Sequence, residues 1–508
     1  MSQDGTRRFW PVVRLVSGPL LAWLVYHGLP SEYVDHAGGR HPLTPEARAT
    51  LGVAVWMAIW WLTEATHIST TALLPLLLFP LIGSRSLSDT ASPYAHPLVF
   101  LFLGGFLLAL AMQRWRLDRR IALLTLSLVG TRPSSMVAGF MGATALLSAF
   151  VSNTATAAMM LPIAMSVVEL VRSGRGSPSE QDKLATALLL GVAYGATLGG
   201  LATLIGTPPN VALAAFLTES IDPPYRLELS FARWLLIGLP VSLVLLPVTW
   251  WLLTRGVIRL ESAAVAGGRE LIAGELRALG PWCWAERTTL VVFLLTAGCW
   301  IFRPWMVEWQ LPGALGGGRP LGHLNDTAIA IAAGISLFLL PSRLSGGEPI
   351  LNWQVARKLP WEILLLFGGG LSLAGAMRAN GVAEFLGAQT GELHRVPDWI
   401  VVLAVTGAIV FLTELTSNLA TVAALLPVLT AIAPGIGIHP YGLLFPATVA
   451  ASCAFMLPVA TPPNAIVFGS GHLRMADMMR VGWWLNLLSI AWLTLLAVFW
   501  FPYVLAVP

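Results

Sequence analysis

The sequence predicts an all-α, polytopic membrane protein built from an internal repeat. Of its 508 residues, 56% are hydrophobic and only 11% are charged, whereas a soluble protein carries about a quarter charged residues. Apolar stretches long enough to cross a bilayer as helices, about twenty residues each, recur along the chain. One polar motif also occurs twice within such stretches, which indicates two related halves.

The repeated motif centres on a Ser-Asn pair. Residues 152–162 read SNTATAAMMLP and residues 417–427 read SNLATVAALLP, with 7 of 11 positions identical at an offset of 265 residues. A second pair follows, because residues 206–210 read GTPPN and residues 460–464 read ATPPN. The first offset also carries Phe102, Gly104, Gly105, Ala109, Ala111 and Met112 onto Phe367, Gly369, Gly370, Ala374, Ala376 and Met377.

About eleven transmembrane helices are expected from the apolar stretches. Two further apolar blocks, 134–171 and 398–434, each carry a Ser-Asn motif near the middle, and we expect them to be re-entrant hairpins that turn back at the motif. An ordinary helix pair is the alternative, but it would need a polar turn at a membrane surface. The expected helices lie near residues 11–28, 50–65, 67–83, 96–112, 184–219, 232–254, 287–303, 325–341, 360–377, 441–470 and 480–503.

The distribution of basic residues predicts the orientation. Eleven crossings put the termini on opposite sides, and a cytoplasmic N-terminus assigns roughly 21 Lys and Arg residues to cytoplasmic segments and roughly 9 to external ones, as the positive-inside rule requires. An odd number of crossings in each repeated unit predicts that the second copy is inverted. The linker at 255–286 has an amphipathic pattern, and we expect it at the membrane surface. Its polar face carries Glu270, Glu275 and Arg277 around Leu271, Ile272 and Leu276.

The proline motifs predict unwound backbone within the membrane. Pro208 and Pro209 cannot continue a helix, because each lacks an N–H and its ring crowds the preceding turn. In hydrocarbon, unwound backbone persists only where it lines a protein cavity or holds a ligand. Paired, interrupted segments at matching places in two halves are typical of a secondary transporter's binding site. For one Ser-Asn pair, hydrogen bonding between helices is the simpler explanation, but two copies, each followed by TPPN, favour a site.

The expected site contains no Lys or Arg. An anion would then be held by neutral donors and helix N-termini, with bound cations offsetting its charge. Carbonyls, hydroxyls and amide oxygens suit a hard cation such as sodium. The sequence pI near 9.2 does not imply nucleic acid, since the basic residues lie in short loops.

Other polar residues in apolar surroundings favour structural roles. Glu64 and Glu414 could couple protons, but both lie beside expected helix ends, where a hydrogen-bonded role is the simpler reading. His67 is expected in a solvated turn, and Asp326 with Asn325 is expected to cap a helix.

Catalytic motifs do not stand out in this sequence. Cys283, Cys299 and Cys453 lack metal-ligand spacing and are expected to be packing residues. Gly368-Gly369-Gly370 lies within an apolar stretch, so we expect close helix packing there. We find nothing that resembles a hydrolase elbow, a metal-ligand cluster or a phosphate-binding loop, and no enzyme is expected.

At these residues the chain resembles the divalent anion/sodium symporter family, solute carrier family 13. The resemblance runs from WWLTEA at Trp60 to the last helix. It implies a homodimer with a scaffold domain and a transport domain that moves across the membrane as an elevator, carrying dicarboxylates, citrate or sulfate with sodium. Its motifs are Ser152-Asn153-Thr154, Ser417-Asn418, GTPPN and the run through Ser452, Phe455, Pro458, Asn464 and Val467.

The resemblance implies roles for individual residues. At least two sodium ions and no organic cofactor are expected. The first sodium site would use Ser148, Ser152, Asn153 and Gly206, and the second Thr413, Thr416, Asn418 and Ala460. Substrate carboxylates would meet Ser152, Asn153, Thr154, Ser417 and Asn418, with Thr207, Thr461 and Leu419 nearby. Leu419 stands where some relatives have Thr, and His67 stands where the family commonly has Pro.

The resemblance and the motifs together divide the chain. N-terminal scaffold helices are expected at 1–95, the linker at 255–286, and further scaffold helices and loops at 287–359. The first repeat spans 96–254, with its hairpin at 134–171 and its broken helix at 184–219. The second spans 360–508, with its hairpin at 398–434 and its broken helix at 441–470.

The sequence therefore predicts a sodium-coupled importer of C4 dicarboxylates such as succinate, malate and fumarate, in a bacterial inner membrane with its N-terminus in the cytoplasm. The expected partners are a small dianion, membrane lipid and a second copy of the chain, without nucleic acid. A sodium-independent dicarboxylate exchanger and a sodium-coupled citrate or sulfate transporter are the alternatives with the same fold. A membrane enzyme acting on a lipid-linked substrate would need a His or acidic cluster at a membrane face, which we do not find.

Overall fold

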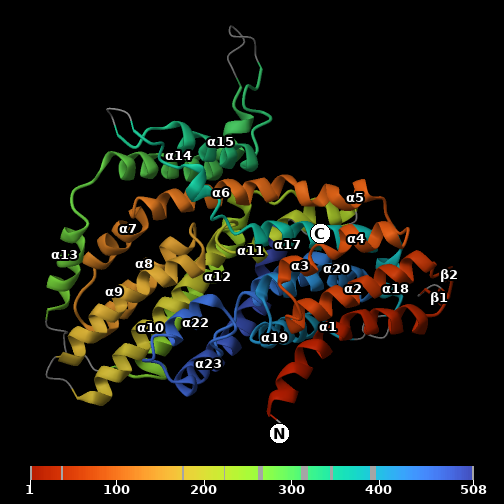
Figure 1. Ribbon diagram of the computed structural model, residues 1–508, viewed down its shortest axis with the longest axis horizontal. Helices are drawn as coiled ribbons and strands as arrows, with labels where there is room; N and C mark the ends of the chain where they lie inside the picture. The colour runs from red at the N-terminus through yellow and green to blue at the C-terminus, as the bar shows by residue number, and fades with distance from the viewer. Residues whose placement is uncertain are drawn as a thin grey trace.

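The computed structural model describes residues 3–35, 38–173, 177–221, 223–260, 267–310, 318–343, 347–389 and 396–505. In these ranges the chain is a set of packed helices, as predicted (Figure 1). A small antiparallel hairpin of β1 (Glu32–Val34) and β2 (Arg40–Pro42) was not predicted. Eight helices in the described ranges are long and apolar enough to cross a membrane, and five shorter apolar helices have 10–17 residues. Two of these eight, Asn153–Arg172 and Asn418–Gly435, lie in the blocks predicted to be re-entrant hairpins, and the other six coincide with predicted crossings.

The N-terminal helices begin at clear capping signals. Thr44 accepts a hydrogen bond from the Ala47 amide at the start of α2, and Ser86 accepts one from the Asp89 amide at the start of α5. The predicted helix at 67–83 is two helices, since α3 ends before Pro75 at the start of α4. The bounds are α1 Gln3–Gly28, α2 Pro45–Thr63, α3 Ile68–Thr71, α4 Leu74–Leu81, α5 Leu87–Ala91 and η1 Ser92–Ala95.

The first repeat has the predicted breaks. One helix ends at Ser148 and the next begins at Asn153, so the Ser-Asn motif forms the turn between them. A second break separates Ala202 from Pro208. The helices are α6 Pro97–Arg114, α7 Leu117–Ser127, α8 Pro133–Ser148, α9 Asn153–Ser173, α10 Pro178–Ala202, α11 Pro208–Ala215, the π-helix η2 Phe216–Ser220, η3 Pro223–Tyr225, α12 Phe231–Trp251 and the π-helix η4 Leu252–Gly256.

The second repeat has the same order of helices. Its Ser-Asn turn lies between Thr413 and Asn418, and its second break separates Ala451 from Pro462. The helices are α17 Trp361–Ala379, α18 Val382–Ala388, α19 Asp398–Thr413, α20 Asn418–Gly435, α21 Pro440–Ala451, α22 Pro462–Phe468, α23 Met475–Leu495, the π-helix η7 Leu496–Trp500 and α24 Phe501–Leu505. Between the repeats lie α13 Gly268–Ala278, α14 Trp284–Glu308, α15 Asp326–Leu339 and α16 Trp353–Ala356.

The two repeats are inverted relative to each other. Arg172 at the end of α9 and Ser179 at the start of α10 line one cavity with Gly471 and Arg474 from the connection between α22 and α23. The start of α21, which is the counterpart of α10, lies instead beside the connection between α11 and α12, where the Tyr441 hydroxyl donates to the Tyr225 carbonyl at 2.8 Å. Equivalent ends of the two hairpins therefore lie at opposite faces.

Helices α6 and α17 pack against each other between the two repeats. Phe102 and Phe367, which are equivalent by the offset of 265, meet edge to face with ring centres 5.5 Å apart. The triple glycine packs closely, as predicted: a Cβ on Gly369 would lie 2.4 Å from the Ala72 carbonyl oxygen. A side chain at Gly369 would push α17 away from the end of α3.

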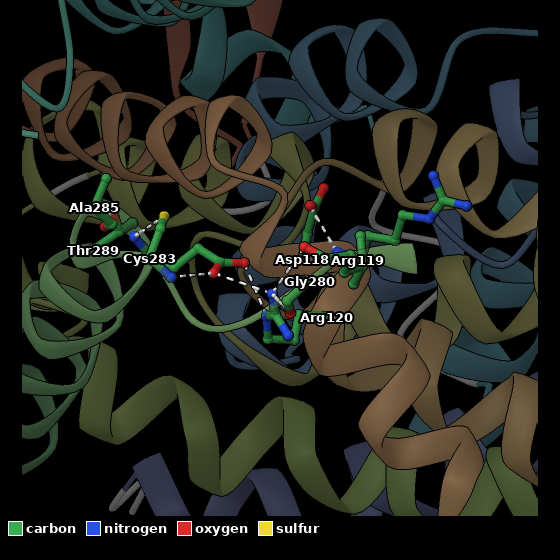
Figure 2. A network of polar contacts seen from close by, with 9 residues as sticks. Asp118, Arg119, Arg120, Gly280, Cys283, Ala285 and Thr289 are labelled. Atoms are coloured by element: carbon green, nitrogen blue, oxygen red, sulfur yellow. Dashed lines mark hydrogen bonds and ion pairs between the residues drawn. The ribbon is translucent and has the colours of Figure 1, made fainter. Parts of the chain in front are cut away.

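The short helix α7 was not predicted, and a buried ion pair holds it against the start of α14. Arg120 donates to both carboxylate oxygens of Glu286 at 2.9 and 3.2 Å, and to the Gly280 carbonyl at 3.0 Å. Glu286 also accepts from the Cys283 amide at 3.0 Å. Figure 2 shows Arg120 of α7 beside the chain at Gly280 and Cys283. The predicted amphipathic linker helix is α13, and its Glu275 pairs with Arg119 at 2.6 Å.

Candidate functional site

The first Ser-Asn turn gathers oxygen atoms around one side-chain amide. The Ser148 hydroxyl lies 2.6 Å from the Asn153 amide, and the amide nitrogen is placed to donate to the Gly206 and Ala196 carbonyls at 3.3 Å each. An added Cβ on Gly200 would come within 2.4 Å of the Asn153 side-chain amide, so a larger residue there would displace the Asn153 side chain. The motif thus brings a hydroxyl oxygen and two carbonyl oxygens together around the Asn153 side chain, and oxygens of this kind suit sodium.

The Asn of the first TPPN motif holds the broken helix in shape. The Asn210 side-chain nitrogen donates to the carbonyls of Gly200 at 3.3 Å and Thr203 at 2.8 Å. The Thr203 hydroxyl donates to the Ala149 carbonyl at the end of the first hairpin helix. These bonds satisfy carbonyls that lost their helical partners where α10 ends.

The second Ser-Asn turn repeats this geometry. The Thr413 hydroxyl lies 2.9 Å from the Asn418 amide oxygen and 2.7 Å from the Ala451 carbonyl oxygen. In both turns the hydroxyl comes five residues before the Asn. The Thr416 hydroxyl donates to the Leu412 carbonyl at 3.0 Å and lies 2.8 Å from the Thr421 hydroxyl. A contribution of Thr416 to a cation would therefore come from its backbone carbonyl.

The second TPPN motif also matches the first atom for atom. The Asn464 side-chain nitrogen donates to the carbonyls of Ala454 at 3.2 Å and Leu457 at 3.1 Å, ten and seven residues back, as Asn210 does. Thr461 additionally caps α22 by accepting from the Asn464 amide at 3.4 Å. Sequence reasoning quoted both Asn residues within the motif but gave them no role, although their repetition was a usable signal.

Each TPPN helix packs against the Ser-Asn helix of the other half. Helix α22 lies against α9, and helix α11 lies against α20. The Tyr194 hydroxyl of α10 joins the halves further by donating to the Phe455 carbonyl of the second break at 2.7 Å. The four motifs therefore lie within one packed unit, although no side chain joins the two Asn residues directly.

Glu414, next to the second Ser-Asn turn, binds the unwound backbone of the second break. Its carboxylate accepts from three consecutive amides, those of Phe455, Met456 and Leu457, at 2.8 to 3.1 Å. It also accepts from the Asn486 side chain of α23 at 2.8 Å. The side chain is only 4% exposed, so the structural, hydrogen-bonded role expected for Glu414 is present in the structure.

The predicted substrate residues differ in exposure. Thr154 is exposed, and Ser152, Asn153, Ser417 and Asn418 are partly exposed. Thr207 and Thr461 are buried beneath the turns, as are Gly206 and Ala460 of the predicted sodium sites.

Leu419 is 5% exposed and lines an apolar crevice with Phe216 and Phe367. Several residues of α17 line the same crevice. Its place among the substrate residues stays a prediction.

Of the other candidate residues, Glu64 and His67 lie at exposed helix ends, whereas Asp326 binds distant parts of the chain. Glu64 is exposed at the end of α2 in a left-handed conformation. His67 caps α3 in an exposed turn, as predicted. Asn325 caps α15, but Asp326 does not share that role: its carboxylate accepts from the Phe231 amide at 2.7 Å and pairs with Arg303 at 2.8 Å.

Two broken helices and two hairpins in inverted halves, with hydroxyl and amide groups gathered at the breaks, define a secondary membrane transporter. Residues 40–507 match the family described as the sodium:sulfate symporter transmembrane region, and the chain belongs to this family. The resemblance found in the sequence is thereby confirmed. Members of the family are transporters rather than enzymes, and the chain is an integral, multi-pass membrane protein.

Relatives support this assignment. The chain is 39% identical over 462 residues to the sodium-dependent dicarboxylate transporter SdcS of Staphylococcus saprophyticus, covering 90% of this chain and 86% of SdcS. SdcS of Staphylococcus aureus is equally similar over the same shares. Among solved structures, MtrF of Neisseria gonorrhoeae has a TM-score of 0.61 at 12% identity over 96% of this chain and 94% of its own. YdaH of Alcanivorax borkumensis has a TM-score of 0.57 at 16% identity over 97% and 99%. These two likenesses concern the fold alone.

Proposed function

We propose that this chain is a sodium-coupled symporter that imports C4 dicarboxylates such as succinate, malate and fumarate. The observation that carries the proposal is the pair of matched turns, in which Ser148 with Asn153 and Thr413 with Asn418 bring neutral oxygen donors together. Two such sites would bind two sodium ions, whose charge offsets that of a dianion. Similarity to sodium-dependent dicarboxylate transporters supports both ion and substrate class.

Sodium would organise each turn before the substrate binds. The first ion would use Ser148, Ser152, Asn153 and Gly206, and the second Thr413, Thr416, Asn418 and Ala460. The dianion would then contact Ser152, Asn153, Thr154, Ser417 and Asn418, with Thr207, Thr461 and Leu419 around it. Because these groups are neutral, the empty site carries no fixed charge through the membrane, which lowers the cost of returning unloaded.

The proposed movement is an elevator step in a homodimer. Residues 1–95 and 287–359 would belong to the scaffold, and the hairpins and broken helices to the moving domain. The chain would lie in a bacterial inner membrane with its N-terminus in the cytoplasm, consistent with the bias of its basic residues. If net positive charge moves inward, the membrane potential adds about 2.3 kcal/mol per charge per 100 mV.

Uptake of labelled succinate into proteoliposomes tests this proposal. The vesicles are either empty or preloaded with unlabelled succinate, with and without an inward sodium gradient. We expect uptake into empty vesicles only with sodium. Uptake that needs internal succinate and ignores sodium would instead make the protein an exchanger. Sodium-driven uptake of citrate or sulfate in place of succinate would keep the coupling and replace the substrate.

A further inference from the structure

A charged cavity of about 550 Å³ lies at the face where the first hairpin ends. Both halves of the chain line it: the end of α9 and the start of α10 from the first, and the chain from the end of α22 into α23 from the second. It is separate from the proposed sodium and substrate sites, which lie at the opposite ends of α9 and α22. Its charged and ionisable lining residues are Arg172, Lys183, Arg474, Arg480, His472, Asp182 and Asp477.

The cavity retains positive charge after its ion pairs are counted. Arg172 pairs with Asp182 at 2.8 Å and Arg474 pairs with Asp477 at 2.7 Å. Lys183 pairs with Glu180 on its own helix, just outside the cavity. Four basic side chains against three carboxylates leave one positive charge, and Arg480 forms no ion pair with any residue in the described ranges. The existing pairs are solvent-exposed and therefore weak, so their arginines can turn to an incoming anion at little cost.

The inverted repeat shows that the fold does not require this cavity. At the opposite face, where the second hairpin ends beside the connection between α11 and α12, aromatic rings fill the corresponding place. Tyr225 meets His439 at 5.1 Å between ring centres, His439 meets Tyr441 at 4.5 Å, and Tyr441 meets Phe445 at 5.8 Å. Aromatic rings pack at one copy of the hairpin end, whereas a basic cavity lies at the other.

The lining indicates the chemistry of the ligand. Arginine guanidinium groups bind phosphate oxygens with paired hydrogen bonds, and a lysine supplies a point charge. The rest of the wall includes Val257, Ile258 and Leu473, which give an apolar surface beside the basic groups. Basic pockets between helix ends at the cytoplasmic side of a membrane are typical binding places for anionic lipid headgroups.

We propose that this cavity binds a phosphate group, from an anionic lipid headgroup or from a soluble phosphate, and that the bound phosphate joins the two halves of the chain. Arg172 and Lys183 reach it from the first half, and Arg474 and Arg480 from the second. The ligand acts as a bridge between α9–α10 and α22–α23, and it stabilises their packing.

Thermal unfolding of the purified, full-length protein in sodium-free detergent solution tests the proposal. One arm adds pyrophosphate against chloride of equal ionic strength, and the other adds cardiolipin against phosphatidylcholine. We expect a rise in Tm in at least one arm. The Arg480→Gln variant should bind the effective probe about tenfold more weakly, as expected when one charge-assisted contact is lost. Arg480 is exposed, so its substitution leaves the core intact.

Two variants serve as controls. Arg357→Gln removes an exposed basic residue outside the cavity and should keep the full response to the probe. Asn418→Ala disables the proposed substrate site and should also keep it, so failure of the transport proposal would be seen separately. A response to pyrophosphate alone assigns a soluble ligand, and one to cardiolipin alone assigns a lipid; both support the site. No response in either arm, or an equal response in Arg480→Gln, overturns it.

Discussion

The two halves hold the same turn in place by different means. In the first half, the neutral Thr203 hydroxyl donates to the Ala149 carbonyl. In the second half, Glu414 occupies the position equivalent to Ala149, and its carboxylate accepts from three amides and the Asn486 side chain. The length of the breaks explains the difference. The second break, at 452–461, is twice as long as the first, at 203–207, and exposes more backbone N–H groups that need acceptors.

The connecting helices, α7 after α6 and α18 after α17, show the reverse: here the first half uses a charged pair and the second half uses neutral groups. In the first half, α7 is held by the buried pair of Arg120 and Glu286. In the equivalent helix α18, Phe385 stands in the place of Arg120 and packs edge to face on Tyr33 with ring centres 5.4 Å apart. These two carboxylate networks thus lie at different places in the two halves: beside α7 in the first and beside the long break in the second. Both halves therefore keep the hydroxyl–amide geometry of the turns. The buried carboxylates, in contrast, differ in position between the halves, and each lies where backbone N–H groups need an acceptor.

The largest effect is expected from Glu414→Ala. The substitution leaves three backbone amides and the buried Asn486 side chain without their acceptor, and loss of one partner from a buried charged network costs about 3–5 kcal/mol. We expect a large fall in Tm in detergent and no uptake. Thr203→Val, the counterpart in the first half, should cost only about 1 kcal/mol. Equal losses from the two variants would contradict the difference drawn between the breaks.

The two asparagines sharpen the comparison at the proposed site. Asn153→Ala and Asn418→Ala should each abolish succinate uptake while the protein stays folded and keeps its oligomeric state, because each removes the amide around which one set of oxygens gathers. Uptake is measured in proteoliposomes, and folding by Tm and size-exclusion chromatography. Normal uptake by either folded variant would remove that turn from the site. Asn352→Ala, at the cap of α16, is a control that should keep transport.

The connecting helices are compared by breaking each contact. Arg120→Leu leaves Glu286 buried without its partner and should cost about 3 kcal/mol. The double variant Arg120→Leu with Glu286→Gln should recover part of this, since Gln still accepts from the Cys283 amide but carries no buried charge. Phe385→Leu in α18 should cost about 1 kcal/mol. Thermal unfolding of the natural chain and the three variants measures these differences in stability. A double variant less stable than Arg120→Leu would show that the buried charge of Glu286 does not cause the destabilisation.

The helix breaks could be predicted from the sequence because the same motif occurs in both halves. The breaks at Asn153, Pro208, Asn418 and Pro462 were predicted because Pro and polar turn residues are expensive in apolar sequence wherever they occur. The halves' differences were harder to see. Glu414 could be recognised as buried and structural, but its partners are backbone amides about forty residues away, and no side-chain pattern marks them.

The short helix α7 and the role of Asp326 were not predicted for another reason. Helix α7 was missed because its stability comes from contacts such as Arg120 with Glu286, which are distant in sequence, and not from a long apolar stretch. The role of Asp326 was missed because a residue beside a cap is normally read locally, whereas its partners are Phe231 and Arg303. Local patterns thus predicted the helix breaks, and tertiary contacts decided the rest.

Asp118 gives the smallest expected effect and concerns the same difference between α7 and α18, since Ala383 stands at its equivalent position in α18. Burial raises the pKa of the Asp118 carboxyl from its ordinary value of 3.8 to about 6, against the opposing effects of the Arg119 amide, which donates to it at 2.7 Å, and the Arg119 charge. The folded pKa lies above the unfolded one, so the folded chain binds the proton more tightly between these values. Stability from this group therefore rises as pH falls from about 6 toward 4.

The Asp118→Asn variant isolates this contribution, because Asn is neutral at every pH and can still accept from the Arg119 amide. We expect the variant to be more stable than the natural chain above pH 6, by on the order of 1 kcal/mol, and the gap in Tm to close as pH falls to about 4. Ala383→Ser in α18 is the matched control, and its Tm difference should not change with pH. A constant gap for Asp118→Asn would mean that the buried carboxyl is already compensated by the basic residues of α7, and that the two connecting helices differ in packing rather than in electrostatics.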